Sequence, residues 1–317
     1  MIKQVFDLRT IAQEMKTAQD QVQQLEPFTS RLRGFDNSSA YEVSYLIHQQ
    51  RIKQGLLSVG RKIGFTNPEV QALYGVSEPI WGYVYDTTVH YLSEDCSKFH
   101  IGRFSEPRIE PEIVVHFCST PPLTDNTDDI LACIDWIAHG VEIVQCHYPN
   151  WKFQAADTIA DSALHAMLLI AEPQNVKGLG AGVISDLQRL EISLSCDGSM
   201  RDQGRGSNVL GSPLVAVAHL ISVIAKQGNA LSIRGRRIGD NRYADSCASN
   251  SCRAELDYQH RGHCLARYKC ILRRVKNIDE CPNKAIRGIL RKAHFSSQSL
   301  NTNHRLCSIV KSDVIEL

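Results

Sequence analysis

The chain has 317 residues, 43% of them hydrophobic, so it is long and apolar enough to bury a substantial core and is not a disordered protein. Its 35 Lys and Arg nearly balance 34 Asp and Glu, for a formal charge of +1, but this balance averages two unlike parts. Residues 1–232 carry 18 basic and 26 acidic side chains, a net charge of −8, whereas residues 233–317 carry 17 and 8, a net charge of +9, and six of the 11 cysteines.

The first 24 residues carry charges from Lys3 onward and contain no uninterrupted apolar run, which predicts no secretory signal. The most apolar window, residues 213–225, includes His219 and Ser222, so no stretch approaches the ~18 to 20 apolar residues of a membrane span. We therefore expect a cytoplasmic protein with no membrane partner. The cysteines before residue 232 are expected to be buried thiols rather than disulfides.

Apolar residues recur at steps of three and four between Leu8 and Leu25, which predicts an N-terminal helix. A second helix is expected to begin near Ser39, where the spacing matches a capping box, and to run toward Gln54. Further along the chain, residues 130–139, 157–170 and 214–224 are predicted to be helical.

From residue 60 onward, short runs rich in Val, Ile and Tyr lie between turn residues and predict strands. The clearest are residues 80–85, 113–117, 141–144 and 190–196, the last followed by an Asp-Gly hairpin turn. Two leading helices followed by a mixed, strand-rich body indicate the α+β class.

The sharpest chemical feature is the segment Glu110-Pro111-Glu112, which is predicted to be extended. Side chains at i and i+2 of a strand project to the same face, so the two glutamates should lie together. Close carboxylates repel unless a proton or cation lies between them, and a hard divalent ion such as Mg²⁺ or Mn²⁺ prefers oxygen ligands. Glu142, inside an apolar strand, is the best third ligand. The alternative is that Glu110 and Glu112 face solvent and Glu142 pairs with a Lys or Arg.

Four other polar residues stand in suggestive settings. Lys62 lies in a glycine-bounded segment where it could reach an anionic substrate, although a surface lysine is the alternative. Asp86 follows the strand predicted at residues 80–85 and is either a strand-end acid or a turn residue. Asp157 and Asp161 are four residues apart on a predicted helix, where capping and solvation are the default roles.

These segments, in this order, resemble the 2-keto-4-pentenoate hydratase family, within the fumarylacetoacetate hydrolase superfamily. The likeness covers roughly residues 1–231 and is specific, because a Glu-Pro-Glu strand followed about thirty residues later by a Glu-Ile strand is difficult to obtain by chance. The matching pieces are residues 61–66, 74–76, 79–82, 109–113, 140–144, 157–162 and 209–213.

The resemblance implies that Glu110, Glu112 and Glu142 ligate a divalent ion, Mg²⁺ or Mn²⁺, and that Lys62 and Asp86 lie near the substrate. It also implies N-terminal helices packed on a mixed β-roll body that assembles into homo-oligomers. The implied reaction is metal-dependent hydration of a small 2-hydroxy-2,4-dienoate to a 4-hydroxy-2-oxo acid in aromatic-compound catabolism, with no nucleic-acid partner.

Two other activities of related chemistry remain open, namely decarboxylation of the 4-oxalocrotonate type and C–C bond hydrolysis of the fumarylacetoacetate type. Such hydrolases normally need a histidine near the metal to act as base. No histidine in this sequence falls at a position that can be equated with it, which favours the hydratase.

Residues 232–317 do not follow the family pattern, because the expected strands of the type Val-Thr-Thr-Gly-Thr-Leu-Thr and Thr-Glu-Gly-Ile-Ala-Leu-Pro-Gly are missing. Codons for residues 239–245 and 258–267, read one base out of register, permit both strands, which predicts a frameshift after about residue 231. The nucleotide sequence across codons 225–245 tests this hypothesis.

The chain is accordingly divided into an N-terminal helical region (1–60), a truncated catalytic body (61–231) and an aberrant, poorly ordered basic tail (232–317). A zinc cluster or a nucleic-acid patch in the tail is disfavoured, because regular ligand spacing and interleaved aromatic residues are lacking. Loss of the native C-terminal strands leaves an inactive, non-enzymatic relic as the alternative of another class.

Overall fold

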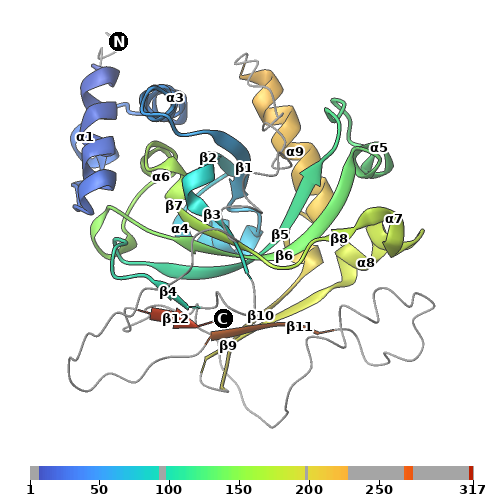
Figure 1. Cartoon of the computed structure of the whole chain (residues 1–317). Helices are drawn as coiled ribbons and strands as arrows, with labels where there is room; N and C mark the ends of the chain where they lie inside the picture. The colour runs from blue at the N-terminus through green and yellow to red at the C-terminus, as the bar shows by residue number, and fades with distance from the viewer. Residues whose placement is uncertain (1–6, 93–97, 197–198, 228–267, 274–313, 317) are drawn as a thin grey trace.

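The computed structural model describes residues 7–92, 98–196, 199–227, 268–273 and 314–316 (Figure 1). Of the tail predicted to be frameshifted, only the backbone of two short strands is described, and the rest of that prediction lies outside the described residues. The α-helices are α1 (Leu8–Gln21), α2 (Phe28–Arg31), α3 (Asn37–Lys53), α4 (Pro68–Tyr74), α5 (Thr127–Leu131), α6 (Ala155–Ala160), α7 (Val176–Leu179), α8 (Val183–Arg189) and α9 (Pro213–Lys226).

Short 3₁₀ turns lie between these elements: η1 (Asp86–Thr88), η2 (Pro149–Trp151), η3 (Ser162–Leu164) and η4 (Gly206–Asn208). The strands are β1 (Ser58–Gly64), β2 (Ile80–Tyr85), β3 (Val89–Tyr91), β4 (Lys98–His100), β5 (Arg108–Phe117), β6 (Ile134–Val144), β7 (His165–Ile170), β8 (Gln174–Asn175), β9 (Glu191–Cys196), β10 (Ser199–Arg205), β11 (Tyr268–Arg273) and β12 (Val314–Glu316). The mixture of helices and mainly antiparallel strands confirms the predicted α+β class.

The central sheet has the order β3-β7-β6-β5, with β8 paired to β6. Strands β5, β6 and β7 are antiparallel neighbours, and β3 joins β7 in parallel. Ile109 of β5 and Val141 and Ile143 of β6 form an apolar core with Leu194 of β9, so one face of the sheet packs on the sheet β10-β9-β11 below it (Figure 1). The opposite face of the sheet therefore carries the alternate residues of these strands, which include the glutamates predicted to be metal ligands.

The N-terminal helices pack on the body through one core. Met15 of α1, Val43 and Ile47 of α3 and Phe28 of α2 are each at most 1% exposed, and they share their core with Val144 of β6. The first two predicted helices are therefore found, although Asp36 rather than Ser39 caps α3 by accepting a hydrogen bond from the Ser39 amide at 2.8 Å.

Two segments predicted to be helical contain strands. Only Thr127–Leu131 of the region around residues 130–139 is helical, and β6 begins at Ile134. The second segment, residues 157–170, ends its helix at Ala160 and continues as β7. Apolar residues at three- and four-residue steps suit a helix as well as a strand buried on both faces, and here pairing in the central sheet decides the outcome.

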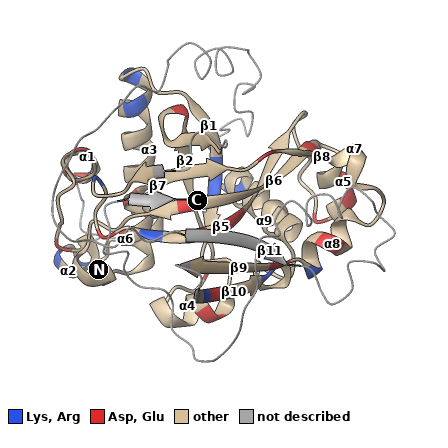
Figure 2. Ribbon diagram, turned by 60° about the horizontal axis from the view of Figure 1, so that its bottom comes forward, with Lys and Arg blue, Asp and Glu red and all other residues tan. Residues whose placement is uncertain are grey.

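Figure 2 shows charged residues on several elements, including acidic residues on α5 and α8.

Residues 206–226 are apolar and long enough to cross a membrane by length and composition alone, contrary to the expectation from the shorter window. Only the 14 residues of α9 are α-helical, about 21 Å of the ~30 Å that a span requires. Leu214 and Ile221 of α9 pack in a core with Ile130, so one face of α9 is buried in the body.

The hairpin of β1 and β2 lies over the glutamate-bearing face and touches a strained turn. Ser162, Ala163 and Leu164 have φ values of 53°, 53° and 64°, a left-handed conformation that non-glycine residues rarely adopt in succession. Gly82 of β2 packs against this turn so closely that a Cβ atom there would lie 2.7 Å from the Ser162 carbonyl oxygen. The turn leads directly into His165, the first residue of β7.

Replacing Gly82 with alanine is expected to destabilise the fold by at least about 2 kcal/mol, because backbone and not a flexible side chain must move to admit the methyl group. Gly60, in the same hairpin, is the matched control: its added Cβ would lie 3.9 Å from the nearest atom, so Gly60→Ala should change stability by less than about 1 kcal/mol. Denaturant unfolding of both variants measures the difference. Equal stabilities would contradict the close packing of Gly82 on the turn.

Candidate metal centre

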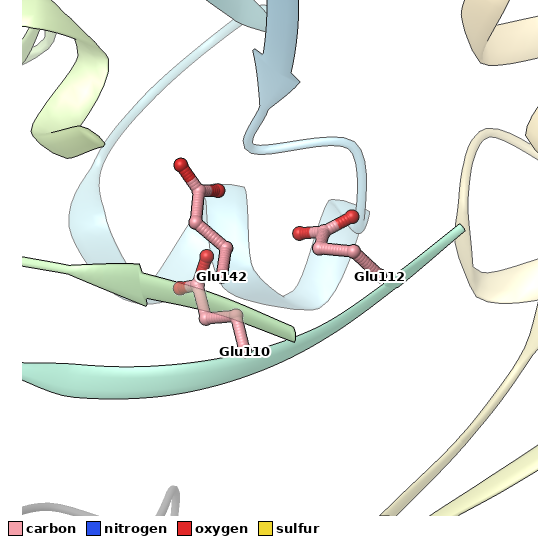
Figure 3. Close-up of side chains that lie close together, drawn as sticks. All are labelled: Glu110, Glu112 and Glu142. Atoms are coloured by element: carbon pink, nitrogen blue, oxygen red, sulfur yellow. The ribbon is translucent and has the colours of Figure 1, made fainter. Parts of the chain in front are cut away.

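Three glutamates meet on one face of the central sheet. Glu110 and Glu142 are direct partners across β5 and β6, and Glu112 follows two residues later opposite Gly140. One carboxylate oxygen from each lies within 4.8 Å of the others, and Figure 3 shows the three side chains rising from the two strands toward the same space. The alternation along β5 and its register with β6 thus bring together all three residues predicted to be metal ligands.

The three carboxylates differ in their access to water. Glu142 is 3% exposed, Glu112 is half-buried, and Glu110 remains open to solvent. A cation could therefore approach from the side of Glu110, while Glu142 forms the enclosed floor of the cluster.

Both oxygens of Glu142 are held by nitrogen donors. Lys62 of β1 places its Nζ 2.7 Å from Oε2, and His165 places its Nδ1 2.7 Å from Oε1. His165 is fixed in turn, because its Nε2 lies 2.8 Å from the Thr88 hydroxyl, which donates to the Tyr85 carbonyl oxygen at 2.9 Å. This series of hydrogen bonds, from η1 through His165 to Glu142, holds the carboxylate in one orientation.

The electrostatics of the cluster indicate a deficit of positive charge. Burial, together with the negative charges of Glu142 and Glu110, raises the pKa of Glu112 well above its usual range. The pKa of Glu110 is also raised, because the protein atoms around its carboxylate and the charge of Glu142 disfavour the ionised form, and Lys62 and Arg108 offset this only in part. Burial acts the same way on Glu142, but Lys62 and His165 outweigh it and lower its pKa.

Lys62 faces all three carboxylates, whereas His165 acts on Glu142 and Arg108 on Glu110. Burial favours the neutral form of Lys62, yet Glu142, Glu110 and Glu112 outweigh it and raise its pKa, so Lys62 is a cation at neutral pH. A further cation would relieve the remaining repulsion, and an all-oxygen ligand set suits a hard divalent ion. The residues present thus fit Mg²⁺ or Mn²⁺.

The sequence did not reveal His165. In a regular strand it would share a face with Met167 and Leu169, which lie in the apolar core below the sheet. A register shift between Ile143 and Val144 leaves Ala166 unpaired in β7, so that Ala166 and Met167 both face this core. His165 consequently turns to the glutamate face, so a histidine does lie beside the candidate metal centre, contrary to the expectation that disfavoured a hydrolase.

The other predicted polar residues lie elsewhere. Asp86 begins η1, and its Oδ1 accepts a hydrogen bond from the Leu57 amide at 2.9 Å, at the end of the hairpin away from Lys62. Its place near the substrate stays a prediction.

Asp157 and Asp161 are 0% and 1% exposed, so the expected solvation at the surface is wrong, although Asp157 does cap α6. Asp157 accepts bonds from the amide and hydroxyl of Thr29 at 2.9 and 2.6 Å and so ties the N-terminal segment to α6. Asp161 lies 2.8 Å from His147 Nδ1 in the buried core.

Comparison with known proteins identifies relatives that belong to one group of enzymes. No family model matches the chain. A 4-oxalocrotonate decarboxylase from a Pseudomonas species is 30% identical over 194 residues, which cover 61% of this chain and 71% of the relative. A 2-keto-4-pentenoate hydratase from Paraburkholderia phymatum is 26% identical over 226 residues, 71% of this chain and 83% of the relative. A 2-hydroxypent-2,4-dienoate hydratase from Pseudomonas putida is 29% identical over 231 residues, 70% of this chain and 98% of the relative.

The fold has a solved counterpart. The structure of 4-oxalocrotonate decarboxylase from Pseudomonas putida G7, complexed with magnesium and adipate, superposes with a TM-score of 0.60 over 72% of this chain and 84% of that chain, at 23% identity. Sequence and fold therefore lead to the same group of proteins, and the predicted resemblance is confirmed. The chain belongs to the family of 2-keto-4-pentenoate hydratases and 4-oxalocrotonate decarboxylases.

Proposed function

We propose that the protein is a divalent-metal-dependent hydratase that converts a small 2-hydroxy-2,4-dienoate to a 4-hydroxy-2-oxo acid in aromatic-compound catabolism. The observation that carries the proposal is the convergence of Glu110, Glu112 and Glu142 around one point, with Lys62 bound to the most buried of them. Relatives named as hydratases of this substrate class, which align with about 70% of the chain, support it.

The three glutamates would hold Mg²⁺ or Mn²⁺. Fold relatives complexed with magnesium and with calcium support a divalent ion. When bound, the ion would orient the substrate through its 1-carboxylate and 2-oxygen and stabilise negative charge that builds on that oxygen.

Lys62 is proposed to act on the substrate from the hairpin above the sheet. As an ammonium it donates hydrogen bonds and accepts none, so it can neutralise the substrate carboxylate or deliver a proton during ketonisation of the dienol. A carboxylate of the cluster would then take the proton from the water that adds at C4, and Asp86 remains a predicted substrate neighbour.

A 4-oxalocrotonate-type decarboxylase is the second candidate, because the decarboxylase from the Pseudomonas species reaches 30% identity. A fumarylacetoacetate-type C–C hydrolase is a third, and His165, 2.7 Å from Glu142, now supplies the histidine that such a reaction needs. The three reactions differ in product: a 4-hydroxy-2-oxo acid, carbon dioxide, or two shorter fragments.

Consumption of 2-hydroxypenta-2,4-dienoate, followed by loss of the dienol absorbance with and without EDTA, tests the proposal. We expect turnover that EDTA abolishes and Mg²⁺ restores, with a 4-hydroxy-2-oxo acid identified by mass spectrometry. Carbon dioxide released from a diacid substrate would support the decarboxylase instead. Folded, metal-binding protein that consumes neither substrate would support the inactive relic.

Three further properties belong to this proposal: a cytoplasmic location, assembly into homo-oligomers, and the division of the chain at residues 60 and 231. The helical region and the catalytic body, residues 1–60 and 61–231, would then form the acidic part of the chain, without nucleic-acid or membrane partners. Size-exclusion chromatography with light scattering tests the oligomeric state.

A further inference from the structure

Two cysteines lie opposite each other at the end of the β5–β6 ladder, next to α5 (Figure 1). Phe117 and Ile134 are the last pair of that ladder, so the next pair outward is Cys118 and Cys133. The Cys118 amide donates to the Cys133 carbonyl oxygen at 2.9 Å, as this pairing requires. Opposite residues of antiparallel strands have Cα atoms about 4.5 to 5.5 Å apart, and a disulfide needs about 4.4 to 6.8 Å. The backbone is therefore already spaced for a disulfide bond.

The thiol of each cysteine lies against the chain beside the other. The Sγ atom of Cys118 is 3.4 Å from the carbonyl oxygen of Cys133. The Sγ atom of Cys133 is 3.8 Å from the carbonyl oxygen of Thr120, two residues beyond Cys118, and 3.5 Å from that of Asp129 in α5. A thiol is a weak hydrogen-bond donor, so these contacts yield easily to a rotation about the Cα–Cβ bond. A side-chain rotation suffices to bring the two sulfur atoms together.

The two thiols differ in their access to solvent. Cys118 is exposed and Cys133 is half-buried, so the expectation of buried thiols is wrong for Cys118, whereas Cys146 is buried as expected. An exposed thiol meets a dissolved oxidant first, and a neighbouring thiol can then attack the oxidised sulfur. Cys118 lies six residues beyond Glu112, about 20 Å along an extended chain, so an inference about this pair does not rest on the metal centre.

We propose that Cys118 and Cys133 are a modification site, at which a peroxide forms a reversible disulfide that closes the segment carrying α5. The Cys118 sulfur attacks one oxygen of hydrogen peroxide, the O–O bond breaks, and the other oxygen leaves as water with the proton of the thiol. The Cys133 sulfur then attacks the sulfenic acid on Cys118 and displaces its hydroxyl group, which leaves as a second water with the proton of the second thiol. The thiols lose two electrons in total, and the peroxide gains them. In a reducing compartment a dithiol returns the link to two thiols by exchange.

The link would join the two ends of residues 119–132. This segment includes α5, whose Ile130 packs in one core with Leu187 of α8 and Leu214 of α9. A cross-link that closes a loop of about 15 residues restricts the unfolded chain and so favours the folded state. For a body of this size we expect the unfolding temperature to rise by about 5 to 10 °C on oxidation.

Peptide mapping of the full-length protein after brief exposure to hydrogen peroxide tests the link. Trypsin releases residues 109–152 as one peptide, because its only basic residue is the last, and this peptide holds Cys118, Cys133 and Cys146. After alkylation of free thiols, we expect the oxidised peptide to carry one alkyl group, and dithiothreitol before alkylation should restore three. Cleavage before Asp128 should leave two fragments that separate only on reduction.

Three variants assign the link and its effect on stability. Cys118→Ser and Cys133→Ser should show neither the link nor the rise in unfolding temperature, each variant being compared with its own reduced form. Cys146→Ala is the matched control, because Cys146 lies in the same tryptic peptide but in the core shared with the N-terminal helices. It should keep both the link and the temperature rise.

Three outcomes would overturn the inference. Peroxide could convert Cys118 to a sulfinic acid while Cys133 stays alkylatable, Cys118 could pair with another cysteine of the chain, or the temperature rise could persist in Cys133→Ser. None of these measurements uses metal or substrate. Failure of the proposed function would therefore leave the peptide map and the unfolding temperatures unchanged, and the two hypotheses are tested separately.

Discussion

Replacing Glu110 with alanine is expected to lower the affinity for Mg²⁺ or Mn²⁺ by at least about 100-fold and to abolish metal-dependent turnover. Changes to residues that merely support metal ligands cost about 10- to 100-fold, and removal of a ligand should cost more. Glu110 is the most exposed of the three ligand residues, so its loss removes the ligand on the side from which the cation would approach Glu112 and Glu142. Calorimetric titration with Mn²⁺ measures the effect directly.

The same variant should be more stable than the wild type when metal is absent. Neighbouring protein atoms and like charge raise the pKa values of Glu110 and Glu112, so the carboxylates repel one another in the metal-free protein, and removing one relieves that repulsion. Mg²⁺ should raise the unfolding temperature of the wild type, because a ligand that binds the folded state stabilises it. It should leave that of Glu110→Ala unchanged.

Glu191→Ala is the control for both measurements. Glu191 is likewise a strand glutamate, the first residue of β9, but it pairs with Arg205 at 3.1 Å, away from the central sheet. It should bind metal and turn over substrate as the wild type does. Folded Glu110→Ala protein that kept the full rate and the full affinity for Mg²⁺ would refute the ligand assignment.

The metal ligands could be predicted because they depend on local rules. The period of two along β5 places Glu110 and Glu112 on one face wherever that strand pairs, and the apolar residues around Glu142 required a partner for its charge. What the period could not supply is the register between β5 and β6. The family resemblance supplied that link, and the pairing of Glu110 with Glu142 now explains it.

The residues that hold Glu142 could be predicted only in part. Lys62 was visible from its glycine-bounded segment, but its bond to Glu142 depends on the placement of the β1–β2 hairpin over the sheet. His165 depends on the unpaired Ala166 and on the left-handed turn before it, and neither irregularity has a signature in residue type. Helix prediction failed at residues 157–170 for the same reason, since the chain leaves α6 through a turn that its residues do not favour.

Replacing Lys62 with methionine is expected to separate catalysis from metal binding. Turnover should fall by at least about 100-fold, the usual contribution of a positioned proton donor, because methionine keeps the side-chain length but has no ammonium. Metal affinity at pH 8 should instead rise, because the variant removes a positive charge 2.7 Å from a ligand oxygen of Glu142.

The pH dependence of metal binding gives this prediction its sharpest form. Lys62 helps to lower the pKa of Glu142 against the opposing effect of burial, so its removal should raise that pKa. Protons will then compete with the metal at higher pH than in the wild type, and the affinity of Lys62→Met should decline earlier as the pH falls. Titrations with Mn²⁺ at a series of pH values measure the displacement.

Lys53→Met serves as the matched control, since Lys53 is an exposed lysine in the last turn of α3 and its loss should alter neither quantity. If Lys62→Met lost metal affinity at pH 8 in proportion to turnover, Lys62 would organise the glutamates rather than act on the substrate. If it kept its turnover, the proton would have to come from elsewhere, and His165, on the other oxygen of Glu142, would be the donor to examine. Lys62 and His165, the two nitrogen donors of Glu142, thus lead to opposite expectations for Lys62→Met: turnover falls if Lys62 supplies the proton and is kept if His165 does. Turnover measured beside the pH series distinguishes the two.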